Sequence, residues 1–316
     1  MSSMAPSLAA LALLLAVPAP KPADPLARLD VRLRAGEWDA LRAELEPAIA
    51  AAAGTRRAAL LVALGLVENE ASSYHRHDPQ KAESTVMRAV EAARAEGDAG
   101  TRARARMLEG RVRYWQGFSD PPRWDEAQRI LNDTRERAAE VKDGRLEAEA
   151  IFYLGLVAQQ QGRWDAARPL FEDALARASR LRDDYLASYP ERHLAYLAGE
   201  AKDLEQAEAR HRRSVALREK VRATVFLPFA RIALAGVLVE RGRRPEAVTL
   251  LRRAAEEGAR SGSRRAEARA LLELQPLLAA DGDAAGARET AARALTAARA
   301  FGDPELVAEA EQAKGE

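Results

Sequence analysis

One helix-pair pattern recurs seven times in this chain, and its last five copies are spaced forty residues apart. The copies align on one residue near the start of the second helix of each pair, at intervals of 41, 45, 40, 40, 40 and 40 residues. Such a period indicates stacked units, because a single helix pair cannot bury its own apolar face. The sequence therefore predicts a solenoid. The aligned residues are Leu41, Ala82, Ala127, Ala167, Ala207, Ala247 and Ala287.

The pair that begins near Leu146 shows the pattern most clearly. Apolar and small residues lie at helical spacing on one face of each helix, as expected for two helices packed against each other. Gly162 separates the helices and is suited to a helix end because glycine adopts positive φ. On the first helix the face consists of Ile151, Leu154, Gly155 and Ala158, and on the second of Ala167, Leu170, Phe171, Ala174 and Leu175.

The order and spacing of Leu154-Gly155, Gly162, Trp164, Ala167, Phe171 and Ala174 resemble the tetratricopeptide-repeat motif. The resemblance covers about residues 25–300, with longer repeats than the usual ~34 residues. It implies an all-α, right-handed α-solenoid of about seven antiparallel helix pairs. A HEAT-type solenoid has a similar period, but the turn with glycine and tryptophan favours tetratricopeptide repeats. We expect pairs at 25–53, 55–96, 101–142, 146–182, 184–220, 224–261 and 264–300, and a capping helix at 304–314.

The first 23 residues differ from the rest of the chain. Ten apolar residues, 8–17, precede a stretch rich in proline and alanine. The apolar run is too short to span a membrane but matches the core of a signal peptide, although no basic residue precedes it. We expect 1–23 to be a leader and linker, and 24–316 to be the solenoid. The protein would then be exported to a bacterial periplasm or beyond, and otherwise it would be cytoplasmic.

Pairs two and three each carry five extra residues between their two helices. Corresponding turns of a solenoid stack along one edge, so the segments 72–80 and 116–123 should lie side by side. Tyr74 and Phe118 belong to these segments, and Tyr114 and Trp115 directly precede the second one. Aromatic residues on loops of a rigid scaffold are a common binding solution, although they could equally pack the turns onto the solenoid.

The resemblance also implies a concave groove lined by the first helix of each pair. Each first helix contacts its partner helix at a small residue, which we call the small contact residue: Gly65, Gly110, Gly155 and Ala195. Positions one, four and five after this residue would face the groove. Tyr189 and Arg192 would extend the row. Amides, arginine and aromatic rings suit an extended peptide or a partner helix, although an ordinary solvated helix face would look the same. The expected groove residues are Leu66, Asn69, Glu70, Arg111, Tyr114, Trp115, Leu156, Gln159, Gln160 and Tyr196.

The sequence supports binding over catalysis. It contains no GxSxG, glycine-rich phosphate loop, HExxH or DxD motif, and its net charge of +1 provides no overall field for nucleic acid. Without cysteine, and with only a weak His75/His77 pair, we expect no metal site and no cofactor. The predicted function is a non-catalytic protein-interaction scaffold. The alternatives are a sensory module that binds a small ligand or signalling peptide, and RNA binding through the helix 102–113.

Overall fold

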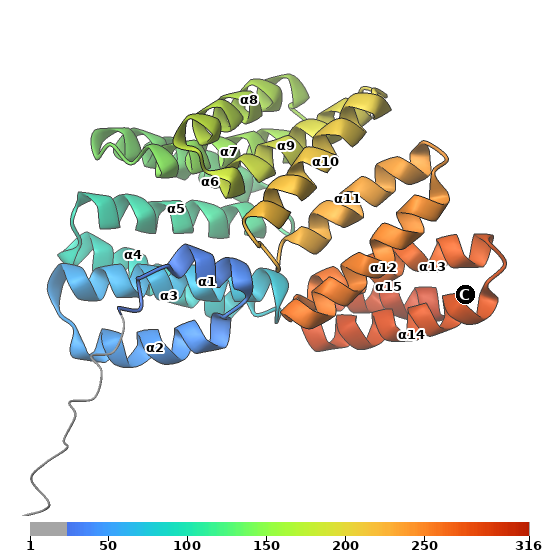
Figure 1. The fold of residues 1–316 in the computed structure, drawn as a ribbon. Helices are drawn as coiled ribbons and strands as arrows, with labels where there is room; N and C mark the ends of the chain where they lie inside the picture. Colours follow the sequence, from blue (N-terminus) through green and yellow to red (C-terminus); the bar gives the residue numbers. More distant parts are fainter. Residues whose placement is uncertain (1–23, 316) are drawn as a thin grey trace, which may run out of the picture.

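The computed structural model describes residues 24–315, which form fifteen helices and no strand (Figure 1). Consecutive helices pack as antiparallel pairs, and the last helix covers the end of the stack. The predicted all-α solenoid of seven pairs and a capping helix is thereby confirmed. The helices are α1 Leu29–Ala35, α2 Trp38–Ala51, α3 Gly54–Tyr74, α4 Pro79–Glu96, α5 Ala99–Gln116, α6 Pro122–Glu140, α7 Gly144–Gln160, α8 Trp164–Leu181, α9 Asp184–Glu200, α10 Leu204–Lys220, α11 Leu227–Glu240, α12 Arg244–Ser261, α13 Arg264–Ala280, α14 Ala284–Phe301 and α15 Pro304–Gly315.

The aligned residues of the repeat lie at the interface within each pair. All seven are buried, and the six alanines leave room for the neighbouring helix to approach closely. Gly155, the small residue on the first helix of the fourth pair, also lets the two helices approach closely. A Cβ atom on Gly155 would lie 2.6 Å from the ring of Phe171, so this position excludes larger side chains.

Aspartates begin many of the helices. Besides Asp303 before α15, six of them accept a hydrogen bond at their side chain from a backbone N–H in the first turn of the following helix, which is the ordinary N-cap arrangement. These caps specify the residue at which each helix begins. They are Asp78, Asp98, Asp143, Asp183, Asp203 and Asp283.

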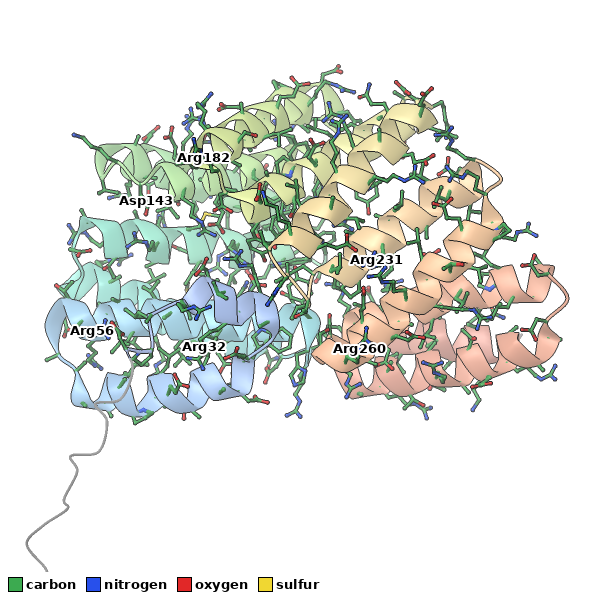
Figure 2. All side chains as sticks on the ribbon, in the orientation of Figure 1. Arg32, Arg56, Asp143, Arg182, Arg231 and Arg260 are labelled. Carbon is green, nitrogen blue, oxygen red and sulfur yellow. The ribbon has the colours of Figure 1, made fainter. Side chains whose placement is uncertain are left out.

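Ion pairs connect neighbouring helices, and Arg231, labelled in Figure 2, takes part in two of them. Arg231 of α11 is nearly fully buried and bonds Glu219 of α10 at 2.7 Å and Glu257 of α12 at 2.8 Å. Arg32 of α1 similarly bonds Glu37 and Glu44. Pairs at exposed positions contribute little to stability, but the buried Arg231 would leave an uncompensated charge if its partners were removed.

The odd-numbered helices form the inner layer, and this layer closes into a ring. Each odd helix from α3 to α13 contacts the next one, and α13 contacts α3 (Figure 1). The chain therefore does not remain an open superhelix. Pairs that are about 190 residues apart in sequence meet at the C-terminal end of α3.

We call this meeting the closure contact, and it combines hydrogen bonds with aromatic packing. His75 Nδ1 lies 2.8 Å from the carbonyl of Gly262, and the backbone N–H of His77 donates to the carbonyl of Phe301 at 2.7 Å. The ring of Tyr74 packs edge-on against Phe226 at 4.9 Å between ring centres. Rings packed in this geometry stabilise a contact beyond the area they bury.

The first pair takes part in the closure contact as well. The N–H of Val225 donates to the carbonyl of Arg34 at 3.3 Å. Gly36 has a φ of +82°, and a Cβ atom there would lie 2.9 Å from the carbonyl oxygen of Ser261. Glycine is therefore required both by the backbone conformation and by the approach of α12.

The apolar segment 8–17 and the expected leader lie outside the described residues. None of the helices within residues 24–315 is long and apolar enough to cross a membrane.

We expect the closure contact to contribute to stability. Tyr74→Ala removes a half-buried ring that packs on Phe226 and Phe229, and should lower the free energy of unfolding by about 2–4 kcal/mol. Thermal unfolding followed by circular dichroism measures the effect. Phe118→Ala is the matched control, because the Phe118 side chain is 53% exposed and its loss should change the midpoint little. Equal effects of the two substitutions would contradict a contribution of the closure contact to the free energy of unfolding.

Candidate functional site

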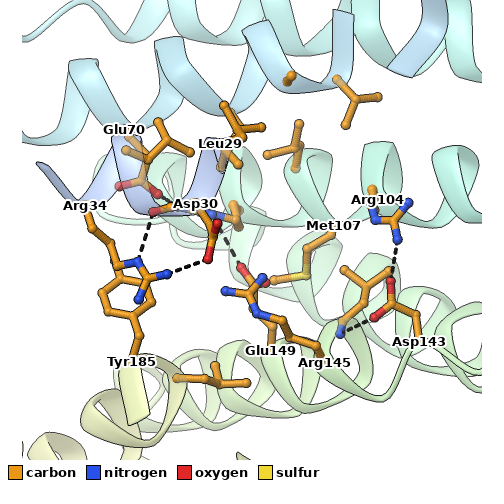
Figure 3. Close-up of a pocket in the computed structure, with 18 of the residues that line it drawn as sticks. Leu29, Asp30, Arg34, Glu70, Arg104, Met107, Asp143, Arg145, Glu149 and Tyr185 are labelled. Carbon is orange, nitrogen blue, oxygen red and sulfur yellow. Dashed lines mark hydrogen bonds and ion pairs between the residues drawn. The ribbon is translucent and has the colours of Figure 1, made fainter. Parts of the chain in front are cut away.

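A cavity of about 500 Å³ lies inside the ring, between the N-terminal parts of the inner helices (Figure 3). Its walls come from five of the seven pairs and from the segment that precedes α11. Most of the lining is apolar or aromatic, as in typical ligand pockets of 300–1,000 Å³. The lining residues are Leu26, Leu29, Asp30, Leu33, Arg34, Ala59, Val62, Ala63, Leu66, Glu70, Thr101, Arg104, Met107, Leu108, Arg111, Asp143, Arg145, Leu146, Glu149, Phe152, Tyr153, Tyr185, Leu186, Tyr189 and Phe226.

The short helix α1 forms one wall of the cavity. Leu29 and Leu33 lie one helical turn apart and point to the same side, and Leu26 precedes them. Asp24 fixes the segment before α1, because its carboxylate pairs with Arg56 of α3 at 2.5 Å. Burial of these leucines, and not the helix propensity of seven residues, holds α1 in place.

The charged side chains of the cavity are paired with one another. Arg104 donates to Asp143 at 2.8 Å, and Figure 3 shows this pair at one end, with Arg34 and Tyr185 at the other. Arg34 bonds Asp30 and lies 4.6 Å above the ring of Tyr185. Every carboxylate of the lining has an arginine partner, so the cavity as a whole carries no uncompensated charge.

Arg111 is the most deeply placed of these charges. It is 8% exposed, bonds Glu70, and contacts Glu149 at 3.4 Å. Burial alone would lower the pKa of Arg111, but Tyr153, Glu70 and Glu149 together hold it well above its ordinary value. The guanidinium therefore stays charged and joins α3, α5 and α7 across the inner face of the ring.

The closure contact completes the cavity wall. Phe226 packs on Tyr185 and Tyr189, whose hydroxyl groups lie 2.6 Å apart. Buried Arg218 donates to the carbonyl of Phe226 at 2.6 Å and lies 4.9 Å above the ring of Tyr189. Phe226 thus both belongs to the closure contact and lines the cavity.

Four of the residues that the sequence places on the groove line the cavity: Leu66, Glu70, Arg111 and Tyr189. Tyr114, Trp115 and Phe118 instead pack together with Trp124 where α5 turns into α6. Tyr114 is buried there, whereas Phe118 remains exposed. The turn 75–78, expected to present a binding edge beside this turn, packs on the last pairs through the closure contact. Whether these residues bind a partner stays a prediction.

The remaining predicted residues form a polar row along the C-terminal parts of α3, α7 and α9. His193 Nδ1 lies 2.9 Å from Gln159 Oε1, and Arg192 donates to the hydroxyl of Tyr196 at 2.8 Å. Gln160 reaches the hydroxyl of Tyr114 at 3.5 Å. Asn69 is buried on α3, and its carbonyl accepts a hydrogen bond from the hydroxyl of Ser73 one turn later. The structure thereby brings the predicted residues of α7 and those of α9 together with their neighbours, at a different place from the cavity.

Sequence reasoning missed the residues of α1 and the N-terminal halves of α5 and α7. Met107 precedes the small contact residue Gly110, whereas only positions after such residues were assigned to the groove. The signal that could have identified Leu26, Leu29 and Leu33 is their helical spacing directly after the proline-rich segment. Phe226 carries no such signal, because its position depends on closure of the ring.

A second hollow of about 280 Å³ lies on the outside, between α4, α5 and α6. Arg94, Arg102, Arg106 and Arg137 line it together with Asp133, to which Arg106 and Arg137 both bond. Of the arginine helix considered for RNA binding, Arg111 and Arg113 lie elsewhere, since Arg113 bonds Glu83 at 2.8 Å. In residues 24–315 no group of three or more potential metal ligands converges.

Comparisons with known proteins agree with this architecture. The family model described as tetratricopeptide repeat matches residues 123–180 and 146–220, which include α7 to α10. No curated protein sequence matches the chain. The repeat match and the fold identify the chain as a tetratricopeptide-repeat protein.

Solved structures with the same fold share little sequence identity with the chain. A Rap protein complexed with competence and sporulation factor is 14% identical over 91% of this chain and 84% of its own, with a TM-score of 0.64. The apo form of RapI is 12% identical over 92% and 80%, with a TM-score of 0.56. A signal transduction ATPase with a tetratricopeptide-repeat sensor from Pyrococcus horikoshii is 14% identical over 85% of this chain and 40% of its own, with a TM-score of 0.54.

The histidine beside the polar row predicts a dependence of stability on pH. His211 is fully buried against Tyr196, and burial, followed by Arg192 and Arg218, lowers its pKa from 6.5 to about 3. The unfolded chain therefore binds a proton below pH 6.5 that the folded chain does not bind until about pH 3. Stability should fall as the pH drops through this range, by about 2 kcal/mol at pH 5 from His211 alone.

Chemical denaturation at pH 8 and pH 5 measures this loss. His211→Leu removes the group that must take up the proton, so the difference between the two pH values should shrink by about 2 kcal/mol. An unchanged difference in the variant would show that His211 is not buried in its neutral form.

Proposed function

We propose that the chain is a protein-interaction scaffold that takes up a peptide segment of a partner in the cavity inside the ring. The observation that carries this proposal is a cavity of about 500 Å³ whose walls come from five helix pairs. Because the walls are helices that pack against their neighbours around a closed ring, the receptor loses little conformational entropy on binding.

The chemistry of the cavity favours an uncharged, apolar segment. Its arginines already bond Asp30, Glu70 and Asp143, so a charged ligand would be buried without a counter-ion. Leu29, Met107 and Phe152 offer apolar surface, and methionine adapts to side chains of different shape. A segment of a few leucine-like residues matches the size and polarity of this lining.

A sensory function is the second candidate, and the position of Phe226 favours it. This residue belongs both to the closure contact and to the cavity wall. A ligand that contacts Phe226 would stabilise the closed ring, and closure would in turn raise the affinity for the ligand. The fold shared with a Rap protein complexed with competence and sporulation factor, and with a tetratricopeptide-repeat sensor, supports this candidate.

Filling the cavity should abolish partner binding. Ala59 is half-buried and lines the cavity, so Ala59→Phe adds a ring where space exists and should leave the fold intact. Partners captured from a native extract on the full chain, identified by mass spectrometry and retitrated as purified proteins, should bind the variant at least tenfold more weakly.

Ala43→Phe is the matched control, because Ala43 is exposed on the outer helix α2. It introduces the same ring without changing the cavity and should retain the affinity of the native chain. Retention of full affinity by Ala59→Phe, with unaltered circular dichroism, would rule out the cavity as the binding site.

A further inference from the structure

We propose that Arg192 and Arg265 hold an oxyanion, a phosphate or carboxylate group, at the C-terminal end of the inner helices, with Arg218 adding to the positive charge. This anion site is separate from the cavity and goes beyond the proposed function. Arg265, at the N-terminal end of α13, reaches Ser73 of α3 and Trp115 of α5, and the charge of Arg192 on α9 acts on it.

Arg218 is buried and Arg192 and Arg265 are half-buried, and all three differ from the buried Arg111 and Arg231 in their partners. Arg111 and Arg231 each bond two carboxylates. Arg192, Arg218 and Arg265 form no ion pair with any carboxylate of residues 24–315. Their positive charges are therefore uncompensated within the described part of the molecule.

Neutral groups surround these three guanidinium groups. Arg265 donates to the carbonyl of Ser73 at 3.3 Å and lies 5.6 Å from the ring centre of Trp115. Arg192 bonds the hydroxyl of Tyr196, and Arg218 donates to Ser188 Oγ at 3.2 Å. Hydroxyl groups, carbonyls and aromatic faces orient the arginines but do not neutralise them.

The same place holds hydrogen-bond donors without an acceptor. Asn69 is 4% exposed, and its Nδ2 has no hydrogen-bond partner among the described residues. Arg192 Nε has none either. Both atoms are donors, so a group that satisfies them must supply acceptor oxygens, and charge-assisted bonds to an anion are the strongest of this kind.

The electrostatics of the site point in the same direction. Burial lowers the pKa of both Arg218 and Arg265, and neighbouring positive charges lower it further, Arg192 at Arg218, and Arg269 followed by Arg192 at Arg265. Tyrosine side chains and the more distant Asp303 oppose this effect only in part. A bound anion would offset the repulsion among the three positive charges, and so would stabilise the closed ring.

Anion-dependent thermal stability tests the site on the full chain. Sodium phosphate at pH 8 should raise the unfolding midpoint in a saturable way, relative to sodium chloride at equal ionic strength. The double variant Arg192→Gln/Arg265→Gln should lose this shift. The matched control Arg94→Gln/Arg102→Gln, with two arginines removed from the outer hollow, should keep it.

Calorimetric titration with two ligands then distinguishes the sources of the anion. Inorganic phosphate represents a free ion or phosphorylated ligand, and an acetylated, amidated Asp-Asp dipeptide represents an acidic peptide. If either ligand binds, and its affinity falls at least tenfold in Arg192→Gln/Arg265→Gln, the site is supported. The ligand that binds then identifies the kind of anion. Binding of neither, or equal binding to both double variants, would overturn it, whatever the outcome of the Ala59→Phe experiment.

Discussion

The contact between the C-terminal end of α3 and the N-terminal end of α13 determines the form of the whole molecule. A tetratricopeptide solenoid is held together by neighbouring units, and nothing in that principle requires its ends to meet. Here His75, Tyr74 and Gly36 meet residues of the sixth pair and of the turn that follows it. Closure adds Phe226 to the wall of the cavity and brings Arg265 to Ser73 of α3 and Trp115 of α5.

The two candidate sites divide the inner face between them by charge. Along α3, α5, α7 and α9, the residues nearer the N-terminus line the cavity, where arginines and carboxylates are paired. The residues that follow form the polar row, where Arg192 and Arg265 have no carboxylate partner. One part of the ring therefore suits an apolar segment, and the other an anion.

The repeat was sufficient to predict the fold from sequence, because its signal is local. Ala167, Gly155 and Phe171 lie within one pair, and their spacing alone specifies two helices in close contact. The inner face was predicted in part for the same reason, since Glu70 and Arg111 follow a small contact residue at a fixed distance. Gln159 and Tyr196 also come together, through His193, although at the polar row and not in the cavity.

The closure of the ring could not be predicted in this way. It depends on small rotations that add up over six pairs, and no single spacing in the sequence reports their sum. The extra residues of pair two illustrate the difficulty, since Tyr74 and His75 suggested an exposed binding turn and pack on Phe226 and Trp38. Residues that depend on closure, such as Phe226 and Arg265, were missed for the same reason.

A distance measurement across the closure contact tests the account most directly. Because the chain has no cysteine, Arg76→Cys and Glu305→Cys place two spin labels on exposed positions on opposite sides of the contact, without background labelling. Double electron–electron resonance should give one narrow distribution at short distance, since His77 N–H bonds the carbonyl of Phe301 between them. A broad distribution centred at a long distance would show an open superhelix, and would contradict the cavity wall at Phe226 and the anion site together.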